Sequence, residues 1–107
     1  MAVGLHVLAP HSANPAPENP AKFANSAIPY AIDLLEKEGV SPPLSVAIAG
    51  GAAMEGSSAG ISMGVKVVEA VKDALVKSKL NISLDETGGS KIRSMSLDID
   101  AGEINIT

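Results

Sequence analysis

The sequence has no cysteine and no tryptophan, and its only aromatic residues are Phe23 and Tyr30 in 107 positions. Without cysteine, these residues can form no disulfide, thiolate zinc site or iron–sulfur cluster, and they carry no thiol nucleophile. With two aromatic rings, the chain has few side chains on which nucleic-acid bases could stack. Its net charge is −4, whereas nucleic-acid-binding proteins usually carry a basic surface. We therefore expect no nucleic-acid partner. The core must consist of alanine, valine, isoleucine and leucine, which suits helices packed closely on a sheet.

Targeting and cofactor signals are also missing from the sequence. No stretch approaches the 18 apolar residues of a membrane span, and no basic, apolar and cleavable leader opens the chain. We therefore expect a cytoplasmic protein without membrane insertion. Neither phosphate-binding glycine motif, G-x-x-x-x-G-K-[ST] or G-x-G-x-x-G, occurs, and neither histidine has a second ligand at metal spacing. The sequence thus predicts no cofactor, no metal and, from its length, one domain over residues 1–107.

The first twenty residues predict a strand followed by a long loop. Residues 1–8 alternate in hydropathy, with Val3, Leu5 and Val7 on one face, which is typical of a half-buried strand. Residues 9–20 contain four prolines, which favour a loop.

A helix is predicted over residues 24–39. The apolar side chains recur at helical spacing, and Gly39 is placed where a helix ends in the left-handed conformation. Pro29 falls inside this pattern. It is harmless there if Asn25 or Ser26 is the N-cap, because the amides of the first turn have no intrahelical acceptor.

The remainder of the chain predicts a strand, a glycine-rich loop, a second helix, a short strand and a C-terminal hairpin. These elements span residues 44–49, 50–60, 62–79, 82–84 and 95–106, in that order. In the second helix, Asp73 and Lys77 form a favourable i,i+4 pair. The predicted fold class is α/β (α+β), with a mixed sheet or sandwich and two packed helices.

Three side chains are candidates for local chemistry. Ser58 lies in a G-x-S-x-G pattern over residues 56–60, but about eight residues separate it from the preceding strand, whereas a nucleophile elbow joins strand and helix directly. The same segment precedes a helix and could bind an anion through its amides. His6 and His11 are the two histidines, and histidine is the residue type whose unperturbed pKa lies closest to neutral pH. We expect His6 on the strand face opposite Val3 and His11 in solvent.

Several segments, taken in order, resemble the CheD family of chemoreceptor glutamine deamidases from bacterial and archaeal chemotaxis. The similar segments are residues 4–10 (GLHVLAP), 22–27 (KFANSA), 50–54 (GGAAM), 63–67 (MGVKV) and 86–89 (ETGG) with the following Arg93 and Ser94. Together they cover nearly the whole chain. The resemblance implies a CheD-like fold, with His6 at the family's catalytic histidine position. It also implies a set of binding residues, which are Gly50, Gly51, Met54, Lys66, Thr87, Gly88, Gly89 and Arg93.

The chain departs from the family pattern at the nucleophile. The resemblance implies a cysteine-dependent reaction, in which a thiolate attacks the glutamine carboxamide and a histidine moves the proton. The family's N-terminal third, with its G-S-C segment, has no counterpart here, because only five residues precede His6. In the family's I-G-x-R-N segment, Lys66 replaces arginine and Val67 replaces asparagine, and lysine cannot supply the planar fork of arginine.

Three functional interpretations remain open at this point. The first is a catalytically inactive CheD-like protein (a pseudoenzyme) that binds a chemoreceptor or a CheC-like protein. The second is a deamidase, and thus a hydrolase, whose nucleophile comes from another chain or from a missing N-terminal segment. An in-frame G-S-C upstream of Met1 would favour it. The third is a small domain with an unrelated binding function.

Two structural expectations follow from the resemblance. Gly88 or Gly89 should adopt positive φ and lie close to the Gly50–Gly51 turn, because paired glycines after a strand usually serve backbone geometry. Without the N-terminal strands of the family, the edge near Val3 should be uncovered. An uncovered strand edge is a template for pairing, so we also expect a homodimer.

Overall fold

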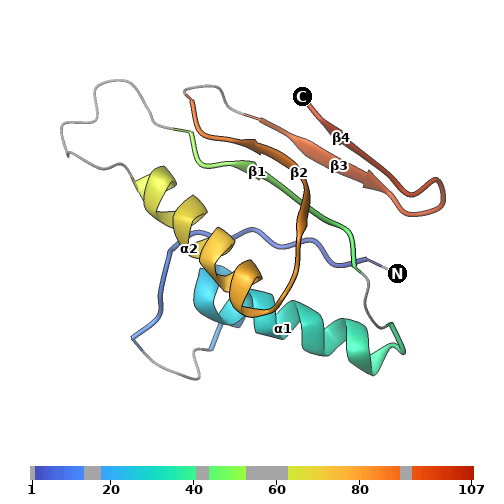
Figure 1. Ribbon diagram of the computed structural model, residues 1–107, viewed down its shortest axis with the longest axis horizontal. Coiled ribbons are helices and arrows are strands. Elements are labelled where there is room, and N and C mark those ends of the chain that lie inside the picture. Colours follow the sequence, from blue (N-terminus) through green and yellow to red (C-terminus); the bar gives the residue numbers. More distant parts are fainter. Residues whose placement is uncertain (1, 14–17, 41–43, 53–62, 90–92) are drawn as a thin grey trace.

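The computed structural model describes residues 2–13, 18–40, 44–52, 63–89 and 93–107. The elements, in chain order, are η1 (Pro20–Lys22), α1 (Ala24–Lys37), β1 (Val46–Gly50), α2 (Met63–Lys77), β2 (Ile82–Thr87), β3 (Met95–Asp98) and β4 (Glu103–Ile106). Both helices lie on the same side of β1 and β2 (Figure 1). The α/β fold class is therefore confirmed, and the elements that lie in described residues are those the hydropathy pattern predicts, apart from residues 1–8 and the short η1.

The strands of the described residues form two separate two-stranded sheets. β1 and β2 are parallel, with α2 as the crossover between them, and β3 and β4 are an antiparallel hairpin. The predicted parallel and antiparallel pairings thus both occur. In the described part of the chain they lie in two sheets, because no ladder joins β2 to β3. The hairpin pairs locally through its own turn, whereas parallel strands need a crossover connection.

The N-cap of helix α1 lies two residues before Asn25 and three before Ser26, which are the two predicted positions. Its N-cap is Phe23, in extended conformation and without a side-chain cap, so the prediction of Asn25 or Ser26 is wrong. The Ser26 hydroxyl donates instead to the backbone oxygens of Pro20 at 2.7 Å and Phe23 at 3.3 Å. Pro29 is consequently the sixth residue of α1, beyond the first turn, where it removes the amide that would bond to the Asn25 carbonyl.

Both helices end in the same backbone motif. After α1, Gly39 has φ of 81° and donates to Glu36, and the Val40 amide donates to Leu35. After α2, the Lys79 and Leu80 amides bond in the same way to Val76 and Leu75, but Lys79 holds a φ of 60° without being glycine. These reciprocal bonds satisfy carbonyls that a helix end leaves without partners. The predicted role of Gly39 is confirmed.

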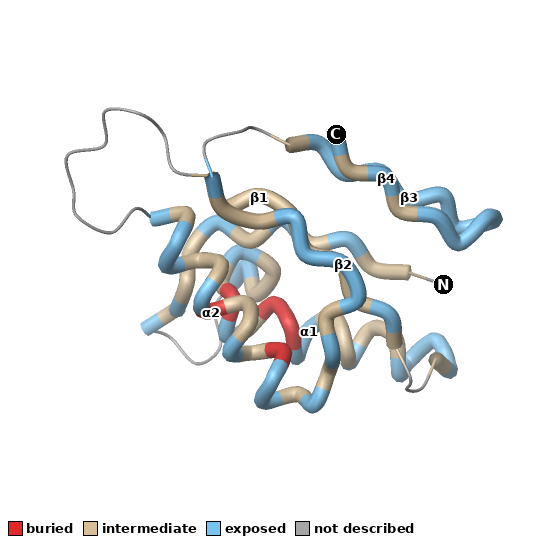
Figure 2. Tube along the Cα trace, turned by 45° about the horizontal axis from the view of Figure 1, so that its top comes forward, coloured by how far each residue is buried: buried red, intermediate tan, exposed pale blue. Residues whose placement is uncertain are grey.

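The buried core lies where α1 crosses α2 (Figure 2). Its members are small or branched aliphatic residues, namely Ala24, Ala27, Ile28, Ala70 and Leu75. Three of these five residues are alanine, which takes up little space between the two helices. No helix within the described ranges is long and apolar enough to cross a membrane.

The N-terminal segment keeps the predicted alternation but forms no strand. Val3, Leu5 and Val7 are half-buried, whereas His6 is exposed. Residues 2–8 carry no ladder in the described structure. At the end of the segment, the Leu8 and Ala9 amides donate to the Lys22 carbonyl, and the Ala24 amide donates to the Ala9 carbonyl. The strand prediction is therefore wrong in its pairing, because alternation reports a half-buried surface and not the presence of a neighbouring strand.

Candidate functional site

The carboxyl ends of β1 and β2 meet at one edge of the parallel sheet. Gly50 is the register partner of Thr87, and the Gly88 amide donates to the Gly50 carbonyl at 2.9 Å. Four glycines turn the chain here, and we call them the glycine corner: Gly50, Gly51, Gly88 and Gly89, with φ values of 106°, 65°, 85° and 67°. The predicted positive φ at residues 88–89 and their closeness to the first turn are both confirmed.

Arg93 holds the two halves of the glycine corner together. Its Nη1 donates to the Gly88 carbonyl at 2.8 Å and to the Gly50 carbonyl at 3.4 Å. A guanidinium has five N–H donors, so most of them remain for other partners. Nη2 lies close enough to Gly89 that a Cβ there would be 3.7 Å away. The half-buried side chain therefore places a fixed positive charge at the edge where the parallel strands end.

The start of α2 packs against the glycine corner with backbone on backbone. A Cβ on Gly64 would lie 2.8 Å from the Gly51 oxygen and 2.9 Å from the Ala52 oxygen. A Cβ on Gly51 would overlap the Val68 side chain. Only glycine fits at both positions. The sequence places Gly64 on the apolar face of its helix. Only the contact with the Gly51 and Ala52 oxygens shows that this position has no room for a side chain.

Thr87 faces a charged pair that sequence reasoning missed. Its hydroxyl donates to Asp85 Oδ1 at 2.6 Å, and Lys72 Nζ lies 2.9 Å from Asp85 Oδ2. The Thr87 hydrogen bond, followed by the Lys72 hydrogen bond and charge, lowers the pKa of Asp85 below its ordinary value. The hydroxyl proton of Thr87 is thus engaged within the protein. Helix and strand spacing alone give no signal that residues 72 and 85 meet.

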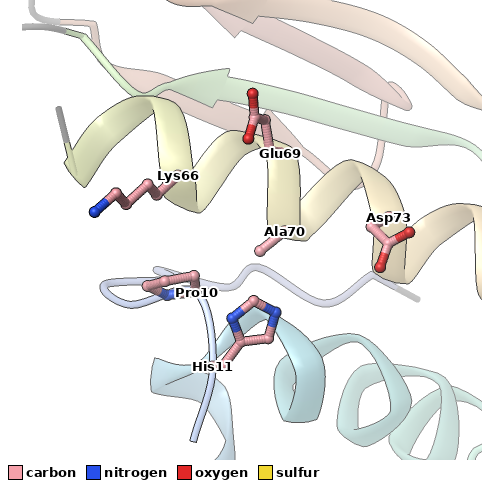
Figure 3. A pocket seen from close by; sticks show the side chains of 6 residues that line it. All are labelled: Pro10, His11, Lys66, Glu69, Ala70 and Asp73. Atoms are coloured by element: carbon pink, nitrogen blue, oxygen red, sulfur yellow. The ribbon is translucent and has the colours of Figure 1, made fainter. Parts of the chain in front are cut away.

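Lys66 does not line the glycine corner but a hollow elsewhere on the surface. This hollow, of about 330 Å³, lies between α2 and the loop at residues 10–11 and is lined by Pro10, His11, Lys66, Glu69, Ala70 and Asp73. Figure 3 shows the His11 ring beneath Ala70, with the Lys66 side chain extending away from it. His11 is exposed, as predicted, but it also lines this hollow, which sequence reasoning missed.

The remaining predicted site residues are not joined to the glycine corner. His6 is exposed on the segment at residues 2–8, and no hydrogen bond or ion pair links it to Arg93 in the described structure. Met54 and Ser58 lie outside the described residues. Within the described ranges, no three histidine or carboxylate side chains come together to hold a metal ion.

Comparison with known proteins identifies the family. The family model "CheD chemotactic sensory transduction" matches residues 8–107. A "Probable chemoreceptor glutamine deamidase CheD" from Methanococcus maripaludis is 37% identical over 101 residues, covering 92% of this chain and 66% of the relative. The "Chemoreceptor glutamine deamidase CheD" of Thermotoga maritima is 34% identical over 100 residues, covering 92% and 62%.

A further relative, from Clostridium kluyveri, is 39% identical over 93 residues, which is 83% of this chain and 57% of that protein. The chain therefore spans between 57% and 66% of the length of these three curated relatives. The family model and the relatives agree with the family resemblance of the sequence. The chain belongs to the CheD family of chemotaxis proteins and is related to the chemoreceptor glutamine deamidases.

Proposed function

We propose that these 107 residues form a CheD-like unit that binds a chemoreceptor but does not by itself hydrolyse glutamine. The observation that carries this proposal is that the expected binding residues come together in the structure, whereas the expected nucleophile is missing from the sequence. The glycine corner and Arg93 form an ordered unit at the sheet edge, whereas the sequence has no cysteine. The edge where parallel strands end is also where α/β folds bind their ligands.

The chemistry explains why binding is favoured over hydrolysis. Deamidation through a thioester needs a thiolate to attack the carboxamide carbon, and a histidine to accept the thiol proton and return it to the leaving ammonia. His6 supplies an exposed imidazole, but no thiol exists in the chain for it to deprotonate. A serine is a much weaker nucleophile and would need both a base and oxyanion donors placed around it.

Arg93 gives the proposed binding surface its specificity. Only one of its terminal nitrogens, Nη1, donates to backbone oxygen in the described structure. The other guanidinium donors suit an oxygen acceptor, which is what a glutamine carboxamide or a glutamate carboxylate on a receptor helix presents. A CheC-like protein that presents a carboxamide or carboxylate oxygen to Arg93 would be an alternative partner.

The test measures binding and ammonia release on the same receptor fragment, one that bears the target glutamines. We expect binding, no ammonia above background, and no effect of thiol reagents. Arg93→Met should weaken binding about tenfold, which corresponds to roughly one charge-assisted hydrogen bond. Lys37→Met is the matched control, because Lys37 lies at the far end of α1 and forms an exposed ion pair with Asp33 of the same helix. Ammonia release that disappears in His6→Ala would contradict the proposal.

A second candidate is a deamidase whose thiol is supplied by another polypeptide segment. The exposed side chain of His6 favours it, since no hydrogen bond of the described structure engages the imidazole. In that case, ammonia should appear only when a separate G-S-C-bearing segment is added to the chain and the receptor fragment. It should disappear again in His6→Ala. If the mixture releases no ammonia, the second candidate is wrong and only the binding function remains.

A further inference from the structure

Strand β4 is the outermost strand of the hairpin and borders no other strand among the described residues (Figure 1). The direction of its backbone groups follows from one pair of bonds. Ser94 and Thr107 exchange both N–H···O bonds, at 2.9 Å each, so the polar groups of Thr107 point toward β3. Backbone direction alternates along an antiparallel strand, which makes Glu103 and Asn105 point inward as well. Ile104 and Ile106 therefore point their amides and carbonyls outward.

We propose that a second copy of this chain pairs with β4 in antiparallel orientation, with the twofold axis passing at Asn105. In this register Ile104 stands opposite the partner's Ile106, and these are the residues whose backbone groups point outward. The two symmetry-related pairs then form four N–H···O bonds. A shift by one residue would place inward-pointing groups at the interface and lose the bonds. A shift by two residues keeps outward-pointing groups opposite each other but leaves one bonded pair within β4 instead of two, so the register at Asn105 forms the most bonds.

The side chains of β4 are compatible with this self-pairing. Glu103, the single ionisable side chain of the strand, stands opposite the partner's Thr107 rather than opposite another carboxylate. Natural edge strands avoid such association through lysine, proline or a bulge, and β4 has none of these. Asn105 meets its own copy across the axis, where the two amide side chains can hydrogen-bond.

The hairpin also has an apolar face that the pairing would extend. Met95 lies opposite Ile106 and Leu97 opposite Ile104, so these four side chains share one face. Met95 is 46% exposed and Leu97 is 41% exposed. A two-stranded hairpin is marginal on its own, whereas the dimer would contain a four-stranded sheet with one continuous apolar face.

Two other candidate edges are less suitable. Self-pairing along β2 would bring the neighbouring carboxylates Asp85 and Glu86 toward their own copies. The segment at residues 2–8, where the sequence predicts the dimer edge, forms no strand in the described structure. The homodimer thus remains a prediction, but its proposed location moves from the N-terminal segment to β4.

Sedimentation of the full chain and of two variants tests the proposal. We expect the wild type to dimerise at a concentration of about 100 µM or below, as a small sheet interface allows. Asn105→Asp and Asn105→Lys each place like charges opposite each other on the axis and should lower the association constant about tenfold or more. An equimolar mixture of the two variants should recover the dimer, because aspartate then faces lysine.

Each outcome decides the proposal. Recovery of association only in the mixture supports pairing at Asn105, and unchanged far-ultraviolet circular dichroism confirms that each variant is folded. A monomeric wild type at about 100 µM overturns the proposal. So does a wild-type dimer that both single variants retain, because the interface would then lie elsewhere.

Discussion

Replacing Gly51 by alanine tests whether the close approach of β1 and α2 holds the glycine corner in shape. Gly51 has φ of 65°, and an added Cβ would overlap a Val68 methyl and lie 3.1 Å from the Gly64 oxygen. Gly102, in the hairpin turn, is a matched control. It has φ of 66°, and nothing lies within 4 Å of an added Cβ. Both substitutions place alanine at a positive φ, but only Gly51→Ala also brings the new Cβ into a clash with Val68.

The expected magnitudes follow from these two terms. Alanine in the left-handed region costs about 1–2 kcal/mol, which is the whole expected effect of Gly102→Ala. Overpacking adds about 1–3 kcal/mol, so Gly51→Ala should lower the free energy of unfolding by about 2–5 kcal/mol. For a domain of this size, each kcal/mol corresponds to a fall in Tm of about 4–8 °C.

Urea unfolding followed by circular dichroism measures both variants, the single variant Val68→Ala, and the double variant that combines Gly51→Ala with Val68→Ala. The smaller side chain removes the overlapping methyl, so the double variant should lose less stability than the sum of the two single substitutions. Equal effects of Gly51→Ala and Gly102→Ala, within about 0.5 kcal/mol, would refute the reasoning, because that is the ordinary error of such comparisons. Simple additivity in the double variant would refute the assignment of the clash to Val68.

Substitutions at two further positions, Arg93 and Asp85, test the charged contacts around the site. Arg93→Met should lower the free energy of unfolding by about 1.5 kcal/mol through loss of the bonds to Gly88 and Gly50, and Arg93→Lys should recover part of it. Wild-type stability in Arg93→Met would mean that the arginine does not hold the corner together. For Asp85, the folded pKa is lowered, so its contacts stabilise the protein above the ordinary aspartate pKa and are lost as the pH falls through the lowered value. Asp85→Asn should therefore unfold at lower urea than the wild type at pH 6, and the difference should shrink as the pH falls below the ordinary aspartate pKa. Identical midpoints at pH 6 would contradict a role for the bond to Lys72.

Local elements could be predicted well because their causes are local. The spacing of apolar residues predicts α1 and α2, and Gly39 marks the helix end at which it adopts positive φ. The i,i+4 pair of Asp73 and Lys77 is present at 3.1 Å. The C-terminal hairpin forms where alternating residues flank a turn, and Gly102 takes positive φ there.

The parts of the site that depend on distant contacts were predicted only through the family resemblance. The resemblance led to the closeness of residues 50–51 and 88–89, but hydropathy alone would not have paired them. The ion pair of Lys72 with Asp85, and the position of His11 beside α2, had no signal in the sequence. The strand predicted at residues 1–8 failed for a related reason, since pairing depends on a neighbour that alternation does not reveal.

The sequence by itself determined the chemistry that this chain lacks and the helices and strands from α1 to β4, but not whether residues 2–8 pair with a neighbour. A missing cysteine removes a thiol nucleophile whatever the fold, and amphipathic spacing acts over a few residues. The tertiary structure alone decided that Arg93 bonds to Gly50, 43 residues away, and that Gly51 and Gly64 must both be glycine. These contacts require the parallel pairing of β1 with β2 and the packing of α2 against their carboxyl ends. Such long-range geometry arises only when the whole chain is folded.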